Sequence, residues 1–210
     1  NDILRFDGMD DSLREQKAGT LEITGTAYPE ADTMTWPGAG ALTYGETLRE
    51  SVLTGGDQQG KGTYAWKTPE AIPTVENTGC TVVFTPDDSN YAPVEHTVSV
   101  AVTPRELTIA GVTAQNRVYD PDSTAVTLTG GSLEESAIVI RDGVPDDAAL
   151  DSTRARGTIA VPDAGTALPV TVSGYALTGA DAVNYTLAQP GYVTVDIARA
   201  AGSGSVTIAG

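Results

Sequence analysis

The run Leu107-Thr108-Ile109-Ala110-Gly111 decides the fold class, because versions of it occur at three places in the chain. Leu21-Glu22-Ile23-Thr24-Gly25 precedes it and Val206-Thr207-Ile208-Ala209-Gly210 follows it. Each run alternates apolar with polar or small residues, which is typical of a half-buried β-strand. The distances between the runs match whole domains and exceed the period of any solenoid repeat. We therefore interpret each run as the opening strand of a unit.

Further landmarks occur in the same order inside the two units. Tyr44 stands as far before Leu53-Thr54-Gly55-Gly56 as Tyr119 stands before Leu128-Thr129-Gly130-Gly131. Later pairs of the same kind are Asn90-Tyr91 and Asn184-Tyr185, each followed by an alternating strand. Matched landmarks in one order indicate an internal repeat.

The repeat predicts an all-β chain of two tandem immunoglobulin-like β-sandwich domains, because short alternating strands separated by turn residues are typical of sandwiches. The expected units are 18–104 and 105–199, with a short proline joint at Thr103-Pro104-Arg105. Residues 1–17 are an N-terminal segment or the tail of a preceding repeat. Residues 200–210 are a linker and the first strand of a truncated next repeat. In the second unit we expect strands at 106–112, 125–129, 137–141, 157–161, 168–173, 184–188 and 191–198.

The charge of the chain excludes some classes of partner. The 210 residues include 28 acidic and 12 basic side chains, for a net charge of -16. Nucleic acid and anionic membranes require clustered Lys and Arg, so neither is an expected partner. Mutual repulsion also favours a monomer. The single cysteine, Cys80, has no internal disulfide partner and is expected to be a packed structural thiol.

The second unit resembles the Tyr-Asp-Gly (YDG) repeat of bacterial surface proteins. The runs that carry the resemblance are Val118-Tyr119-Asp120, Val126-Thr127-Leu128-Thr129-Gly130, Val170 through Asp181, and Asn184-Tyr185-Thr186-Leu187. The first unit is similar to related immunoglobulin-like repeats, through Gly62-Thr63-Tyr64-Ala65-Trp66-Lys67, Val82-Val83-Phe84-Thr85-Pro86 and Asn90-Tyr91. The turn after the tyrosine departs from the family pattern, being Tyr119-Asp120-Pro121 here and Tyr44-Gly45-Glu46 in the first unit.

The resemblance implies a stalk or adhesion segment of a large surface or secreted protein of Gram-positive bacteria, located outside the cell at the surface or cell wall. We expect no enzymatic activity. His96 is the only histidine and lies in phase with an apolar strand, so catalytic triads lack a plausible base. The alternatives are an adhesin module that binds a host glycan or extracellular matrix protein, and an accessory region of a large secreted hydrolase.

Several residues are candidates for binding or for structural roles. Calcium, which prefers carboxylate and carbonyl oxygens, is the one cofactor considered, and solvated turns are the alternative for the same side chains. Its candidate ligands are Asp120, Asp122, Asp146, Asp147 and Asp151. Trp36, in an inserted turn-rich segment, is either a loop anchor or a ligand contact. Trp66 is expected in the core, and Tyr91 and Tyr185 are expected to be buried with hydrogen-bonded hydroxyls, as in a tyrosine corner.

Overall fold

The computed structural model describes residues 34–56 and 61–202, which form strands and turns without an α-helix. The helical turns in this part of the chain are 3-10 turns of three residues, namely η3 (Leu48–Glu50), η4 (Glu135–Ala137) and η5 (Ala182–Asn184). The prediction of an all-β chain is confirmed. No helix within the described residues has the length and apolar character needed to cross a membrane. The expected N-terminal segment 1–17 and the expected opening strands at 21–25 and 206–210 lie outside the described residues.

Strand pairing divides the described residues into two groups, which we call the N-terminal segment (residues 34–104) and the C-terminal segment (residues 105–202). No described strand of one segment pairs with a strand of the other. The N-terminal segment contains β1 (Gly38–Ala39), β2 (Leu42–Thr43), β3 (Leu53–Thr54), β4 (Gly62–Trp66), β5 (Cys80–Pro86), β6 (Val94–Val98) and β7 (Val102–Thr103). Its main sheet is the antiparallel β4-β5-β6, beside the antiparallel pair β1-β3 and the parallel pair β2-β7.

The C-terminal segment has more strands, many of them only two residues long. They are β8 (Arg105–Ala110), β9 (Thr113–Ala114), β10 (Arg117–Val118), β11 (Ala125–Val126), β12 (Leu128–Thr129), β13 (Ser132–Leu133), β14 (Ile140–Arg141), β15 (Val144–Pro145), β16 (Ala149–Asp151), β17 (Arg156–Thr158), β18 (Gly165–Ser173), β19 (Ala176–Thr178), β20 (Tyr185–Ala188) and β21 (Val193–Ala198). The sheets are β10-β21-β18-β17-β11, β13-β8-β20, and the pairs β9-β12, β14-β15 and β16-β19.

Strand β21 shows why the alternating sequence forms a sheet with one inner face. Val193, Val195 and Ile197 are buried, and the residues between them are exposed. Because successive side chains point to opposite faces, the strand covers a core on one side and meets water on the other. Its buried face joins Val126, Ile159, Val170, Val172 and Tyr175 in one core, against which residues of β8, β9, β12 and β16 also pack.

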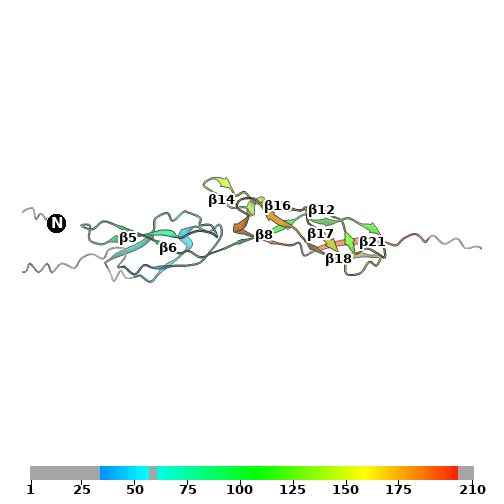
Figure 1. Ribbon diagram of the computed structural model, residues 1–210, viewed down its shortest axis with the longest axis horizontal. Coiled ribbons are helices and arrows are strands. Elements are labelled where there is room, and N and C mark those ends of the chain that lie inside the picture. The colour runs from blue at the N-terminus through cyan, green and yellow to red at the C-terminus, as the bar shows by residue number, and fades with distance from the viewer. Residues whose placement is uncertain (1–33, 57–60, 203–210) are drawn as a thin grey trace, which may run out of the picture.

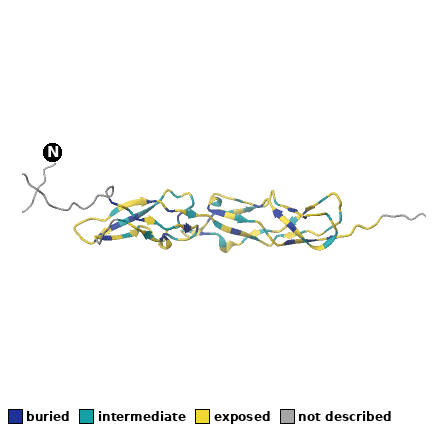
Figure 2. Cartoon of the chain, turned by 90° about the horizontal axis from the view of Figure 1, so that it is seen from below, coloured by how far each residue is buried: buried dark blue, intermediate teal, exposed yellow. Residues whose placement is uncertain are grey.

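The two segments follow one another along the long axis of the molecule (Figure 1). The hairpin β14-β15 projects from the side of the molecule near the point where they meet. Buried residues are distributed through both segments and do not form one central core (Figure 2). The point of contact is consequently defined by a small number of side chains.

Candidate functional site

A cluster of buried side chains, which we call the joint, lies where the two segments meet. Tyr44 of the N-terminal segment packs with Leu107, Val139 and Tyr185 of the C-terminal segment. The rings of Tyr44 and Tyr185 meet edge to face, with centroids 5.3 Å apart and planes at 86°. Edge-to-face contact is a favourable arrangement for aromatic rings and adds to the energy of apolar burial. The joint is therefore a packed interface.

Asp146 is the polar centre of the joint, and its side chain is only 1% exposed. The hydroxyls of Tyr44 and Tyr185 donate to its Oδ2 at 2.6 Å and 2.7 Å. Arg141 donates from Nε to Oδ1 at 2.9 Å. A buried carboxylate is tolerated when its charge and lone pairs are satisfied, and here the guanidinium and two hydroxyls do so. One of these bonds, from Tyr44, crosses between the segments.

Backbone pairing holds each side chain of the joint in place. Strand β2 runs parallel to β7, and the Tyr44 N–H then donates to the Thr103 carbonyl at 2.9 Å. Tyr185 opens β20, which pairs parallel with β8 and places Tyr185 opposite Arg105. Asp146 directly follows the hairpin β14-β15 and donates its N–H to the Val139 carbonyl. Sheet register, rather than a flexible loop, therefore positions the tyrosines.

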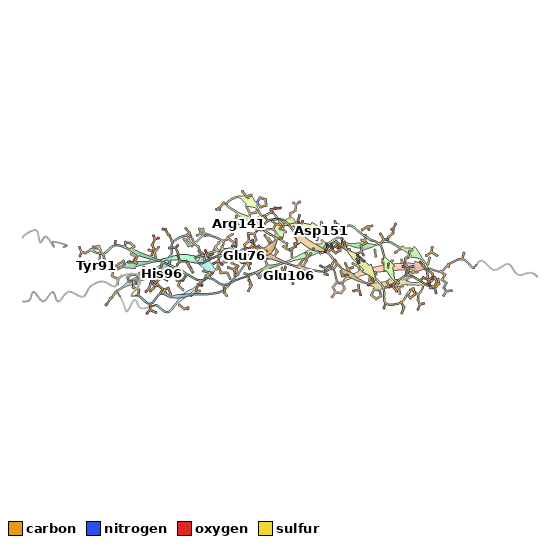
Figure 3. The ribbon with its side chains drawn as sticks, in the orientation of Figure 1. Glu76, Tyr91, His96, Glu106, Arg141 and Asp151 are labelled. Carbon is orange, nitrogen blue, oxygen red and sulfur yellow. The ribbon has the colours of Figure 1, made fainter. Side chains whose placement is uncertain are left out.

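A second layer of polar contacts surrounds Asp146. Arg141 also donates through Nη2 to Asp181 Oδ1, and Asp181 Oδ2 accepts the N–H of Asp147 at 2.9 Å. Figure 3 shows Arg141 in the region where the segments meet. The buried Asn184 contributes a second bond across the joint, since its Oδ1 accepts the N–H of Val75 at 3.0 Å. Two hydrogen bonds from separate elements thus fix the orientation of the segments.

Gly45 allows the close approach of the two backbones. Its φ is +100°, and a Cβ at this position would lie 2.9 Å from Nη1 of Arg105 and 3.0 Å from a methyl group of Val139. A side chain would therefore press on the C-terminal segment, and the positive φ would add strain for any L-residue. This explains the glycine after Tyr44.

The joint shifts the pKa values of its titratable groups in directions that keep the network intact. Burial, together with the hydrogen bond to ionised Asp146, raises the pKa of Tyr44 above its ordinary value, and burial raises that of Tyr185 to about 12. Burial of Asp146 by itself favours the neutral acid, but the hydrogen bonds from Tyr44, Tyr185 and Arg141 outweigh it and hold its pKa below the ordinary value. At neutral pH both tyrosines are protonated donors and Asp146 is a charged acceptor.

This chemistry suits fixation more than catalysis. The oxygens of Asp146 are occupied by donors, and the tyrosine hydroxyls point at a carboxylate rather than into an open cleft. These three hydrogen bonds hold the carboxylate, the guanidinium and the two phenol rings in one arrangement.

The five aspartates considered for calcium are not brought together. Within the described residues, no group of three or more acidic, histidine or cysteine side chains is arranged to hold a metal ion. Asp146 pairs with Arg141, whose guanidinium supplies the positive charge there. Three of the other candidates accept backbone N–H groups in turns: Asp120 from Asp122, Asp147 from Ala180 and Asp151 from Thr153. The five side chains thus lie in separate surroundings, and calcium binding by any of them stays a prediction.

The two tyrosines expected to be buried differ. Tyr185 is 6% exposed, donates its hydroxyl hydrogen to Asp146 and accepts the Val139 N–H at 2.9 Å. Tyr91 is 41% exposed, so the prediction of burial is wrong for it. Figure 3 shows Tyr91 at the end of the N-terminal segment remote from the joint. Trp66 is half-buried against Leu42, Leu48 and Val100, and its Nε1 donates to the Ser51 carbonyl at 2.9 Å.

Trp36 lies in an aromatic cluster on the N-terminal segment. Its ring stacks on that of His96, with centroids 4.9 Å apart and planes at 15°, and tilts against Tyr64 at 5.5 Å. It is half-buried, which agrees with a loop anchor while leaving part of the ring accessible. His96 is exposed on β6, and Cys80 is partly buried, with burial raising the pKa of its thiol.

Sequence reasoning missed the network itself. Tyr44 was only a repeat landmark, Asp146 was assigned to calcium, and Arg141 received no role. The available signal was the pairing of Tyr44 with Gly45, since a glycine after a landmark tyrosine indicates close approach of another backbone. Nothing in the spacing identifies Asp146 as the acceptor, because it is 102 positions away.

The strands and 3-10 turns of residues 34–56 and 61–202 place this part of the chain in the all-β class. Residues 103–192 match the YDG domain family, so a YDG domain is present there. The match spans β8 through β20, which includes every residue that the C-terminal segment contributes to the joint. No curated protein and no solved structure matches the chain.

Proposed function

We propose that the chain is a non-catalytic stalk segment of a large surface or secreted bacterial protein, built from two immunoglobulin-like β-sandwich domains at 18–104 and 105–199. The observation that carries the proposal is the hydrogen bond from Tyr44 to buried Asp146, which ties the segments end to end. Buried contacts between two domains restrict their relative motion, which suits a projecting rod better than a flexible string of domains. The YDG domain at 103–192 supports the bacterial surface context only by its resemblance to repeats of such proteins.

Small-angle scattering tests the rod. The radius of gyration should be well above the ~17 Å expected for one compact globule of this length, and it should not change on dilution. Tyr44→Ala, which removes the central contact of the joint, should broaden the distribution of interdomain distances. Thr127→Ala, an exposed change away from the joint, is the matched control. A compact native particle would overturn the proposal.

An adhesin is the second candidate, favoured by the aromatic cluster around Trp36. A shallow hollow beside it is lined by Pro37, Leu53, Gly55, Thr63 and Tyr64. Partly accessible aromatic faces are common platforms for sugars and peptides. A glycan and matrix-protein array tests this, with binding abolished by Trp36→Ala and retained in Tyr192→Ala, which alters an exposed aromatic on the other segment. If the native chain binds nothing on the array, the stalk is the only proposed function that remains.

A further inference from the structure

Tyr119 occupies the same backbone position in the C-terminal segment as Tyr44 does in the N-terminal segment. Each tyrosine follows a two-residue strand that runs parallel to the last strand of its segment, β2 beside β7 and β10 beside β21. The Tyr44 N–H donates to Thr103 at 2.9 Å, and the Tyr119 N–H donates to Ala198 at 2.8 Å. The following landmark, a short Leu-Thr strand before two glycines of positive φ, also recurs in the structure.

The surroundings of the two hydroxyls differ. That of Tyr44 is bonded to Asp146, and the residue is 1% exposed. Tyr119 is half-buried with its ring against its own core, and its hydroxyl makes no hydrogen bond within the described residues. It borders a hollow lined by Asp163, Ala164, Arg199 and Ala200. At its far end the C-terminal segment therefore carries the donor tyrosine of a joint, and residues 34–56 and 61–202 place no acceptor opposite its hydroxyl.

We propose that this end, formed by Tyr119, Asp163, Arg199 and Ala200, is a docking surface for a further unit built like residues 105–202. The acceptor for the Tyr119 hydroxyl is that unit's equivalent of Asp146, supported by its equivalents of Tyr185 and Arg141. The inference rests on the proposed stalk function. It extends that function by having the contact that joins these two segments recur between each unit and the next.

The occupant is argued from sequence and charge. The run Val206-Thr207-Ile208-Ala209-Gly210 repeats the sequence of β8, the strand that follows the first joint. Asp120 follows Tyr119 at the position where Gly45 follows Tyr44. This end therefore has a carboxylate at the position that, in the first joint, is a glycine lying next to Arg105. A basic residue at the Arg105 position of an incoming unit complements that charge.

The same geometry predicts that single chains do not dock on one another through this surface. The only acceptor of this kind among the described residues is Asp146, and Tyr44 of the same chain already occupies it. The Tyr119 end of one molecule therefore finds no vacant acceptor on a second. Docking requires a unit whose acceptor is vacant, and a repeat added in tandem provides one.

The test uses an extended chain, in which residues 1–198 are followed by a second copy of residues 104–202 so that the spacing of the first joint is kept. Tyr119→Phe should raise the unfolding equilibrium constant of the extended chain by roughly tenfold or more, the range for a hydrogen bond to a charged group. In the native chain, 1–210, the same change should alter it by less than about twofold. Tyr44→Phe serves as the positive control in both.

A double-mutant cycle locates the effect. Asp146→Asn in the second copy alone should make Tyr119→Phe nearly silent, because the two changes remove the same interaction. Equal effects of Tyr119→Phe in the two chains, or additive effects in the cycle, would overturn the proposal. Failure of the second copy to fold would also overturn it, since the same residues fold behind the Tyr44 end. A rod-like native chain would in each case leave the stalk function standing.

Discussion

At the scale of single residues, the contact between the two segments depends on the buried carboxylate of Asp146. Asp146 is stable as a charged group because Tyr44, Tyr185 and Arg141 direct hydrogens at both of its oxygens. The desolvation penalty of a buried ion pair can equal the attraction between its charges. The main contribution of such a pair is therefore to fix the relative positions of the groups that it joins. Removing one partner should nevertheless destabilise the folded state, because the Asp146 charge then stays buried with fewer hydrogen-bond donors.

The first prediction concerns the tyrosine hydroxyls. Tyr185→Phe should destabilise the chain by about 1.5–3 kcal/mol, since it removes a hydrogen bond to a charged group without creating a cavity. Chemical denaturation measures the change. Tyr192→Phe is the control, because Tyr192 is fully exposed and should change the free energy of unfolding by less than about 0.5 kcal/mol. Equal costs at the two positions would contradict a special role for the buried hydroxyl.

The second prediction is the pH range of the joint. Asp146 has a lowered pKa in the folded state, so its contribution is present above about 3.9, the ordinary value, and is lost as the pH falls through the lowered one. Tyr185 has a pKa raised to about 12, so its contribution is complete below about 10 and is lost as the pH rises toward that value.

Denaturation at a series of pH values checks this range. Asp146→Asn should reduce the dependence of stability on pH on the acid side, since the titrating group is gone. An identical acid slope in the native chain and in the variant would show that other carboxylates control the acid transition.

At the scale of elements, tight turns containing glycine join neighbouring strands. Gly174 follows β18 with a φ of +88°, and a Cβ there would lie 2.1 Å from the carbonyl oxygen of Arg154. Gly143, in the β14-β15 hairpin, has a similar φ of +79° but no atom within 4 Å of such a Cβ. Substitutions at Gly143 and Gly174 therefore distinguish the cost of a left-handed backbone conformation from the cost of a steric clash.

The third prediction follows from that pair. Gly143→Ala should cost about 1–2 kcal/mol, the penalty of a left-handed conformation for a residue with a Cβ. Gly174→Ala should cost clearly more, because a backbone oxygen must also move. Thermal or chemical denaturation of both variants gives the comparison, and equal losses would mean that the turn after β18 relaxes freely.

The sequence predicted the long elements better than the short ones. The alternation of Val193, Val195 and Ile197 identified β21, since a period of two has one structural meaning over six residues. Strands of two residues, such as β9 and β10, carry no period to detect. The run at 137–141, expected as one strand, instead contains the last residue of η4 and the two residues of β14. Contacts between residues far apart in the sequence, such as that of Tyr44 with Asp146, could not be predicted, because no local sequence pattern encodes them.

At the scale of the whole molecule, the joint couples two segments that share no sheet. The coupling consists of the aromatic contact and the hydrogen bonds to Asp146 and Asn184. Because these groups are buried, unfolding of one segment exposes part of the other. The segments should then not unfold independently.

The fourth prediction concerns this coupling. Scanning calorimetry of the native chain should show one transition, with calorimetric and van't Hoff enthalpies in agreement. Tyr44→Ala should separate it into two, because the cluster then loses its N-terminal member, with a loss of about 3–5 kcal/mol typical of large buried aromatics. Two resolved transitions in the native chain would contradict the coupling.

The parallel pairing of β8 with β20, and of β21 with β10, has a mechanical consequence. Tension applied along the chain enters the C-terminal segment through β8 and leaves through β21. Cross-strand hydrogen bonds lie across the strand direction, so such a pull loads them in shear, and several must break together before either strand slides. Resistance of this kind is set by the barrier to unfolding rather than by equilibrium stability. The C-terminal segment should accordingly bear load with little extension.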